Sequence, residues 1–181
     1  LPIEREVKPL ILGTITMYMV GLIDDIYDLR PYLKLAGQIV AALIVTFYGI
    51  TIDFISLPIG PTIHFGIFSI PITVIWIVAI TNAINLIDGL DGLASGVSAL
   101  ALMTIGFIAI LQANIFIIMI CCVLLGSLLG FLFYNFHPAK IFLGDSGALM
   151  IGFIIGFLSL LGFKNITFIA LFFPIVILAV P

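Results

Sequence analysis

Long apolar runs separated by short polar segments dominate the chain. Most runs reach the roughly 17–25 residues that cross a bilayer as a helix, and a helix satisfies its own backbone hydrogen bonds in hydrocarbon. We therefore predict an all-α, polytopic transmembrane fold with about seven helices. The predicted ranges are 9–24, 32–49, 70–85, 92–112, 114–134, 146–163 and 165–181. The first of these would be short for a bilayer-spanning helix.

Residues 50–69 interrupt this pattern. Polar and apolar residues alternate here, and Pro58, Gly60, Pro61 and Gly66 punctuate the segment. Alternation combined with turn residues is typical of a β-hairpin. We predict a short hairpin outside the bilayer.

Composition supports a membrane protein. Of the 181 residues, 64% are hydrophobic and 8% are charged, whereas soluble domains carry about 25% charged residues. No polar linker divides the sequence, so we expect residues 1–181 to form a single integral-membrane domain. The chain lacks an initial Met and stops at Pro181 within an apolar run, so we expect it to be a fragment of a longer protein.

Six of the nine acidic residues lie in three polar islands, which are residues 24–28, 82–91 and 144–147. A carboxylate beside hydrocarbon is costly unless it has a partner or a function. Two predicted helices separate each island from the next, and an even number of crossings returns the chain to the same side. We therefore predict that all three islands face one aqueous compartment. Lys and Arg residues divide three against three between the two sides, so the positive-inside rule does not identify that compartment.

The first island indicates a site for a cation and a phosphate. The adjacent carboxylates of Asp24 and Asp25 resist ionising together unless a cation neutralises them. Mg²⁺ is a hard cation that binds oxygen and is usually shared with phosphate. Arg30 and Lys34 follow closely and offer donors for phosphate oxygens.

The other two islands supply further polar groups. Asn82, Asn85 and Asp88 are spaced by three residues, so they share one helix face. Asp145 begins an apolar helix, where an anion is favoured and where free N–H groups also bind phosphate. Together the islands predict Mg²⁺-dependent chemistry on a phosphate or diphosphate, achieved mainly by charge neutralisation and positioning.

Two pairs of glycines have the spacing that lets helices approach closely. They are Gly126 with Gly130 and Gly152 with Gly156. Such pairs are typical of helix packing within a membrane domain, and a homodimer face is the alternative use.

Three blocks carry a resemblance to a known family: GLIDDIYDLRPYLKLAGQ, TNAINLIDGLDGLASG and NFHPAKIFLGDSGALMIGF. They resemble, in order and spacing, the polyprenyl-phosphate N-acetylhexosamine-1-phosphate transferases, which are of the glycosyltransferase family 4 type. Ile87 before Asp88 and the FLGDSG block are more similar to bacterial undecaprenyl-phosphate GlcNAc-1-phosphate transferases than to phospho-MurNAc-pentapeptide translocases. The former initiate teichoic acid, O-antigen or common-antigen synthesis.

The resemblance implies that UDP-GlcNAc and undecaprenyl phosphate give undecaprenyl-diphosphate-GlcNAc and UMP. It implies Mg²⁺, with Mn²⁺ as a substitute, and ten or eleven helices with the active site on the cytoplasmic face of the bacterial inner membrane. The hairpin at 50–69 would then lie on the extracytoplasmic side. It also implies a basic, His-containing loop that selects the sugar, which we expect beyond Pro181. No nucleic-acid partner is expected.

Residue roles follow from the same resemblance. Asp145 is the leading metal ligand and Asn85 a second. The catalytic set is Asp24 and Asp25 at the lipid phosphate, Lys34 at the diphosphate, and Asp88. The substrate contacts are Asn82, then Asn85 and Asp88 along the sugar-phosphate path, and Leu90, Asp91 and Phe142 around uracil.

Several alternatives stay open at this point. A phosphate monoester has its second pKa near 6, so direct attack of the lipid phosphate is favoured over a step that needs a strong base, but a two-step route through an aspartyl-phosphate remains. Rival functions are a UbiA-type Mg²⁺-dependent prenyltransferase, an intramembrane aspartyl protease and a cation channel or transporter. Transporters place such residues near the bilayer midplane, whereas these islands gather at one surface.

Overall fold

Six α-helices make up most of the computed structural model, which describes residues 2–56 and 62–162. Their bounds are α1 (Pro2–Tyr27), α2 (Pro31–Phe47), α3 (Ser69–Ile87), α4 (Leu93–Leu111), α5 (Ile115–Asn135) and α6 (Gly144–Gly162). All except the shorter α2 are long and apolar enough to cross a membrane. The predicted all-α polytopic membrane fold is confirmed. The seventh predicted helix, 165–181, lies outside the described residues.

The first helix is longer than the predicted range 9–24. α1 has 26 residues and contains Pro9, so it extends about 39 Å at 1.5 Å per residue. The prediction of a short helix was wrong because charged residues such as Glu4 and Arg5 continue it. Arg5 reaches the C-terminal end of α2, where its Nε lies 3.0 Å from the carbonyl oxygen of Tyr48. This contact gives a partner to a carbonyl group just beyond the last turn of α2.

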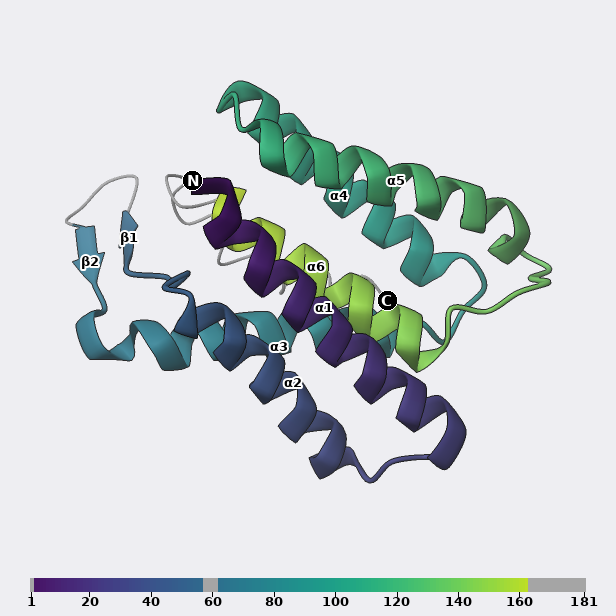
Figure 1. Cartoon of the computed structure of the whole chain (residues 1–181). Coiled ribbons are helices and arrows are strands. Elements are labelled where there is room, and N and C mark those ends of the chain that lie inside the picture. The colour runs from purple at the N-terminus through teal and green to yellow at the C-terminus, as the bar shows by residue number, and fades with distance from the viewer. Residues whose placement is uncertain (1, 57–61, 163–181) are drawn as a thin grey trace.

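The predicted hairpin is present between α2 and α3. Strands β1 (Phe54–Ser56) and β2 (Thr62–His64) pair antiparallel, with Phe54 opposite His64. A short 3₁₀ helix, η1 (Gly66–Phe68), then leads into α3. The hairpin lies at the end of α2 and α3 that is far from the three polar islands (Figure 1).

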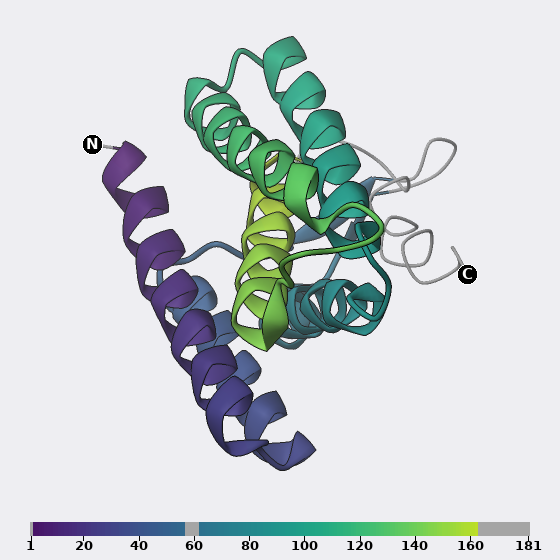
Figure 2. The ribbon, with the colours of Figure 1, turned by 90° about the vertical axis from the view of Figure 1, so that its right-hand side faces the viewer.

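Helix α6 lies at the centre of the molecule and packs against α1, α3 and α4 (Figure 2). Nearly every residue from Ala148 to Gly162 is buried. A Cβ at Gly152 would lie 2.8 Å from the Cα of Thr81, and one at Gly156 would lie 3.5 Å from the Cα of Ile77. This glycine pair therefore packs α6 against α3, as predicted.

The second glycine pair has a different environment. No atom of the described residues lies within 4 Å of a Cβ placed at Gly126 or Gly130 on α5. Packing of these two glycines within the domain is therefore not seen among the helices that the structure describes, and a dimer face stays a prediction.

Helices α1 and α6 cross very closely at Gly21. A Cβ at this position would lie 2.4 Å from the Cα of Ser146 and 2.6 Å from the carbonyl oxygen of Asp145. No larger residue fits here without moving one backbone. The crossing brings the end of α1, with Asp24 and Asp25, beside the start of α6.

Candidate functional site

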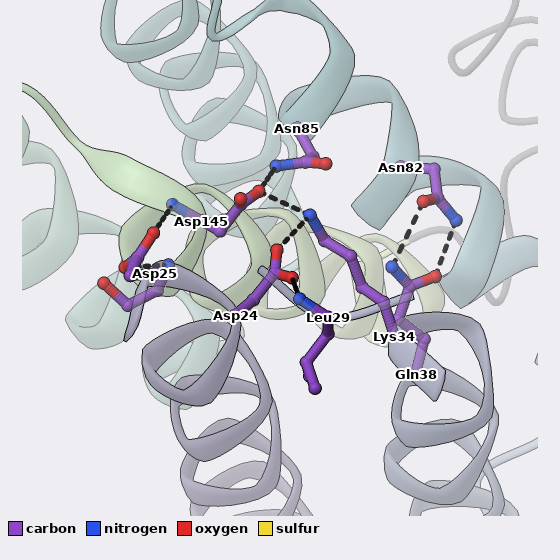
Figure 3. A network of polar contacts seen from close by, with 9 residues as sticks. Asp24, Asp25, Leu29, Lys34, Gln38, Asn82, Asn85 and Asp145 are labelled. Carbon is purple, nitrogen blue, oxygen red and sulfur yellow. Dashed lines mark hydrogen bonds and ion pairs between the residues drawn. The ribbon is translucent and has the colours of Figure 1, made fainter. Parts of the chain in front are cut away.

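The three polar islands meet at one end of the bundle. Asp24 lies in the last turn of α1, Lys34 in the first turn of α2, Asn85 in the last turn of α3 and Asp145 in the first turn of α6. Figure 3 shows these side chains pointing toward one another. The islands meet at one end of the bundle, as counting crossings predicted, and their exposure to one aqueous compartment stays a prediction.

A single ammonium group joins two of these carboxylates. Nζ of Lys34 lies 2.6 Å from Oδ2 of Asp24 and 2.6 Å from Oδ1 of Asp145. The amide nitrogen of Asn85 also donates to Oδ1 of Asp145. The other oxygen of Asp24, Oδ1, accepts from the backbone N–H of Leu29 at 2.9 Å, and Asp24 as a whole is only 8% exposed.

Asp25 contacts a different group from its neighbour. Its two oxygens accept from the backbone N–H groups of Asp145 at 2.8 Å and Ser146 at 3.0 Å. Asp25 thus caps the N-terminus of α6, where the helix dipole favours a negative charge. The preceding Gly144 has φ +69°, and a Cβ there would lie 3.1 Å from Oδ2 of Asp25, so glycine suits this turn on both counts.

A cavity of about 370 Å³ opens beside this network. Five residues predicted to belong to the site line it: Asp24, Lys34, Asn82, Asn85 and Asp145. The remaining lining residues are Asp28, Leu29, Pro31, Leu35 and Gln38. The wall is therefore polar toward α3 and α6 and partly apolar along the loop between α1 and α2.

Gln38 was not singled out from the sequence, but it belongs to this wall. Its amide pairs with that of Asn82 through two hydrogen bonds of 3.1 and 2.6 Å. Gln38 lies one helical turn after Lys34, and residues four apart share a helix face. That spacing was the available signal.

Asp88 is half-buried just after α3 and does not line the cavity. Burial raises the pKa of its carboxyl group to about 6, and the negative charges of Asp145 and Asp25 contribute to the increase. Asp88 is thus close enough to the network to respond to its charge.

The remaining predicted residues lie on two neighbouring loops. Oδ2 of Asp91 is 2.9 Å from Nδ1 of His137 and accepts from the N–H of Ala139 at 3.1 Å. Hydrogen bonds from Ala139 and His137 lower the pKa of Asp91. Asp91 does not cap α4, since Gly92 with φ +73° holds the N-cap position without a side-chain cap.

Asn135, also not singled out from the sequence, joins the same two loops from inside. Its Oδ1 accepts from the N–H of Gly92 at 3.2 Å and from Oγ of Ser95 at 2.8 Å, and its Nδ2 donates to the carbonyl of Ile141 at 2.9 Å. Leu90 and Phe142 are 68% and 75% exposed on these loops. They are accessible to a ligand but do not line the cavity.

The donor set fits a magnesium ion of the kind shared with a substrate. Within residues 2–56 and 62–162, no three His, Cys, Asp or Glu side chains form a metal-binding group. Mg²⁺ usually binds one or two carboxylates and completes its shell with water and phosphate oxygens. Asp145 offers a carboxylate here, and the carboxylates of Asp24, Asp25 and Asp88 outnumber the single ammonium group of Lys34. This excess of negative charge favours a cation.

Comparison with known proteins agrees with this arrangement. The sequence model of the family described as "Glycosyl transferase family 4" matches residues 8–163 of this chain. The chain is 44% identical to a probable undecaprenyl-phosphate N-acetylglucosaminyl 1-phosphate transferase of Bacillus subtilis (strain 168), over 98% of this chain and 50% of the relative. It is 38% identical to a phospho-N-acetylmuramoyl-pentapeptide-transferase of Streptococcus thermophilus (strain CNRZ 1066), over 83% of this chain and 47% of the relative.

A phospho-N-acetylmuramoyl-pentapeptide-transferase from Campylobacter jejuni (strain RM1221) is 33% identical over 92% of this chain and 56% of the relative. The chain spans about half the length of the curated relatives it matches. The resemblance carried by the three islands is confirmed, and the chain belongs to glycosyl transferase family 4.

Proposed function

We propose that the protein containing this chain transfers GlcNAc-1-phosphate from UDP-GlcNAc to undecaprenyl phosphate. The products are undecaprenyl-diphosphate-GlcNAc and UMP, and the reaction takes place at the cytoplasmic face of the bacterial inner membrane. The observation that carries this proposal is the ammonium group of Lys34, which lies 2.6 Å from each of two carboxylates at a cavity wall. The name of the Bacillus subtilis relative supports the choice of sugar and lipid.

The proposed chemistry is a direct phosphoryl transfer. An oxygen of the lipid phosphate attacks the β-phosphorus of UDP-GlcNAc, a new P–O bond forms, and the bond from the β-phosphorus to the bridging oxygen breaks as UMP leaves. Lys34 lines the cavity and would exchange a contact with Asp24 or Asp145 for one with phosphate oxygens. Catalysis then consists mainly of orienting two anions and offsetting their repulsion.

Magnesium is part of the proposal. Asp145 would hold the ion together with Asn85, whose amide would rotate to present its oxygen in place of the nitrogen that now faces Asp145. When bound, Mg²⁺ neutralises diphosphate charge and stabilises the leaving UMP. Mn²⁺, also a hard cation that accepts oxygen ligands, would substitute.

The other residues have supporting roles in this proposal. Asp24, held by Lys34 and Leu29, would orient the lipid phosphate. Asp88 would lie beside the sugar-phosphate path. The exposed ring of Phe142, with Leu90 and Asp91 on the neighbouring loop, would receive the uracil base.

The test is UMP release by the purified full-length protein in detergent with undecaprenyl phosphate, Mg²⁺ and a series of UDP-N-acetylhexosamines. We expect turnover with UDP-GlcNAc and its loss on removal of divalent cations. Asp145→Asn should lower the rate by at least about 10²-fold, the scale of losing one well-placed electrostatic group. Asp53→Asn, in the segment leading to the hairpin at the far end, is the matched control and should keep wild-type activity.

A related activity is favoured by the Streptococcus and Campylobacter relatives, which are named for phospho-N-acetylmuramoyl-pentapeptide transfer. The same assay with UDP-N-acetylmuramoyl-pentapeptide as donor distinguishes the two. Turnover with that donor alone would replace GlcNAc in the proposal, and no UMP release from any donor would overturn it.

A further inference from the structure

The amide pair of Gln38 and Asn82 joins α2 to α3 on the wall of the cavity. Nε2 of Gln38 donates to Oδ1 of Asn82 at 3.1 Å, and Nδ2 of Asn82 donates to Oε1 of Gln38 at 2.6 Å. Nδ2 of Asn82 also donates to the carbonyl of Val78 at 2.9 Å. Both N–H groups of Asn82 are therefore used within the protein, which leaves it poorly suited to binding a substrate directly.

The hydrogen bonds of this pair are directional contacts beside buried apolar residues of α2. Gln38 is only 1% exposed, and the buried residues that follow it on α2 are Ala41, Ala42 and Val45. Ala and Val side chains make no directional contacts, so they specify the relative position of two helices less strictly than hydrogen bonds do. Two hydrogen bonds between facing amides fix one relative position, and a polar pair in an apolar interface is known to set helix register.

On both helices, the pair lies one turn from a side chain that contacts Asp145. Lys34 precedes Gln38 by four residues on α2, and Asn85 follows Asn82 by three on α3. Lys34 and Asn85 both donate to Oδ1 of Asp145. A displacement of α2 along α3 would therefore pull these two donors apart at the same oxygen.

We propose that the Gln38–Asn82 amide pair is a positioning device, which fixes the register of α2 against α3 and so holds Lys34 beside Asp145. Gln38 and Asn82 are positioning residues in this proposal, since they act on the reaction through Lys34 and Asn85. The effect on turnover rests on the proposed transferase function, whereas the effect on the position of Lys34 does not.

The position of Lys34 can be measured without any substrate. A water-soluble carbodiimide activates a carboxylate, the neighbouring amine displaces the urea leaving group, and an amide remains with no added atoms. At 2.6 Å, Lys34 should form such a bond with Asp145 or Asp24. Peptide mass spectrometry of the full-length protein in detergent gives the yield of both products.

The informative variants remove the pair in different ways. Gln38→Leu leaves one amide unpaired, whereas the double variant Gln38→Leu with Asn82→Leu leaves none and therefore should fold if the single variant does not. The exchange Gln38→Asn with Asn82→Gln keeps both amides. Gln112→Leu is the matched control, because Gln112 also joins two helices by its amide, donating to the carbonyl of Gly162 at 2.8 Å far from the cavity.

We expect the Lys34–Asp145 product to fall to a small fraction of the wild-type yield in Gln38→Leu and in the double variant, and to return in the exchange variant. Turnover should fall by about 10²-fold in kcat, the scale of a displacement near 1 Å, even where the double variant melts at the wild-type temperature. Gln112→Leu should lower the melting temperature but keep the crosslink and the turnover.

Three results would overturn the proposal. One is a wild-type crosslink yield in the folded double variant, and another is a low yield in a folded exchange variant. The third is turnover that simply follows the melting temperature across all variants, including Gln112→Leu. Lack of transfer by the wild-type protein would count against the proposed function alone, because the crosslink yields would still report the position of Lys34.

Discussion

At the scale of single residues, two adjacent carboxylates have separate tasks. Asp24 is buried and bound to Lys34, whereas Asp25 turns to the N-terminus of α6 and accepts from Asp145 and Ser146. Successive residues on a helix point about 100° apart, so the two side chains diverge from the same turn. Asp25 thus acts on the backbone that carries Asp145, while Asp24 takes part in the network at the cavity.

Replacing the cap should test this division. Asp25→Ala removes both acceptors and should lower the free energy of unfolding by about 1 kcal/mol, a common cost of losing an N-cap. Asp25→Asn keeps one acceptor oxygen at the same reach and should lose less. Thermal unfolding in detergent gives the comparison, with Asp28→Asn as a control at the neighbouring left-handed residue, where Asn is tolerated. Equal losses for Ala and Asn would contradict a capping role.

At the scale of elements, the close crossing of α1 and α6 builds the site. Gly21 lets the two backbones meet one turn before Asp24. The cap by Asp25 and the contact from Lys34 to both Asp24 and Asp145 depend on that approach, because each joins the end of α1 to the start of α6 directly or through α2. A helix pair one methyl group further apart would lose several of these contacts together.

Gly21→Ala should therefore damage both stability and the site. We expect an overpacking cost of about 1–3 kcal/mol and a loss of UMP release larger than the stability change explains. The measurements are thermal unfolding and turnover in detergent. Gly96→Ala on α4, where a Cβ meets no described atom within 4 Å, should be neutral or slightly stabilising. Similar behaviour of the two variants would rule out a special role for the crossing.

Much of this element-scale picture could be predicted from sequence, and the rest depends on side-chain direction. Hydropathy located the helices, and counting crossings brought Asp24, Asn85 and Asp145 to one end of the domain. Neither method gives the rotation of α1 about its axis, which decides that Asp24 and not Asp25 contacts Lys34. Gln38 was missed although it lies one helical turn after Lys34, whereas Asn135, a single amide at the end of an apolar run, has no pattern of its own.

At the scale of the whole molecule, negative charge is concentrated at one end of a nearly uncharged bundle. Burial raises the pKa of Asp88 from the ordinary 3.8 to about 6, and the nearby negative charges of Asp145 and Asp25 add to the increase. The folded state therefore holds the proton of Asp88 more tightly than the unfolded chain does. Between about pH 4 and pH 6 the protein loses stability as the pH rises, and above pH 6 the ionised carboxylate carries its full cost.

Asp88→Asn should remove this dependence. In EDTA, the variant and the wild type should melt at similar temperatures near pH 4.5, and the variant should melt higher above pH 7. Because Asp88 is half exposed, solvent screening reduces the gain to about 1 kcal/mol. A melting-temperature difference that does not change between pH 4.5 and pH 7.5 would contradict the assignment.

The burial of α6 has a consequence for how the protein is made. About 72% of its apolar window is buried within the protein, against 22% for α5. Most of α5 can therefore face lipid, but α6 begins with the charged Asp145 and carries Gly152 and Gly156 on the face that meets α3. Helix α6 is surrounded mainly by other helices, and α1, α3 and α4, which pack against it, are synthesised before it. The order of the helices along the chain therefore allows the helices that bury α6 to be in the membrane before α6 is inserted among them.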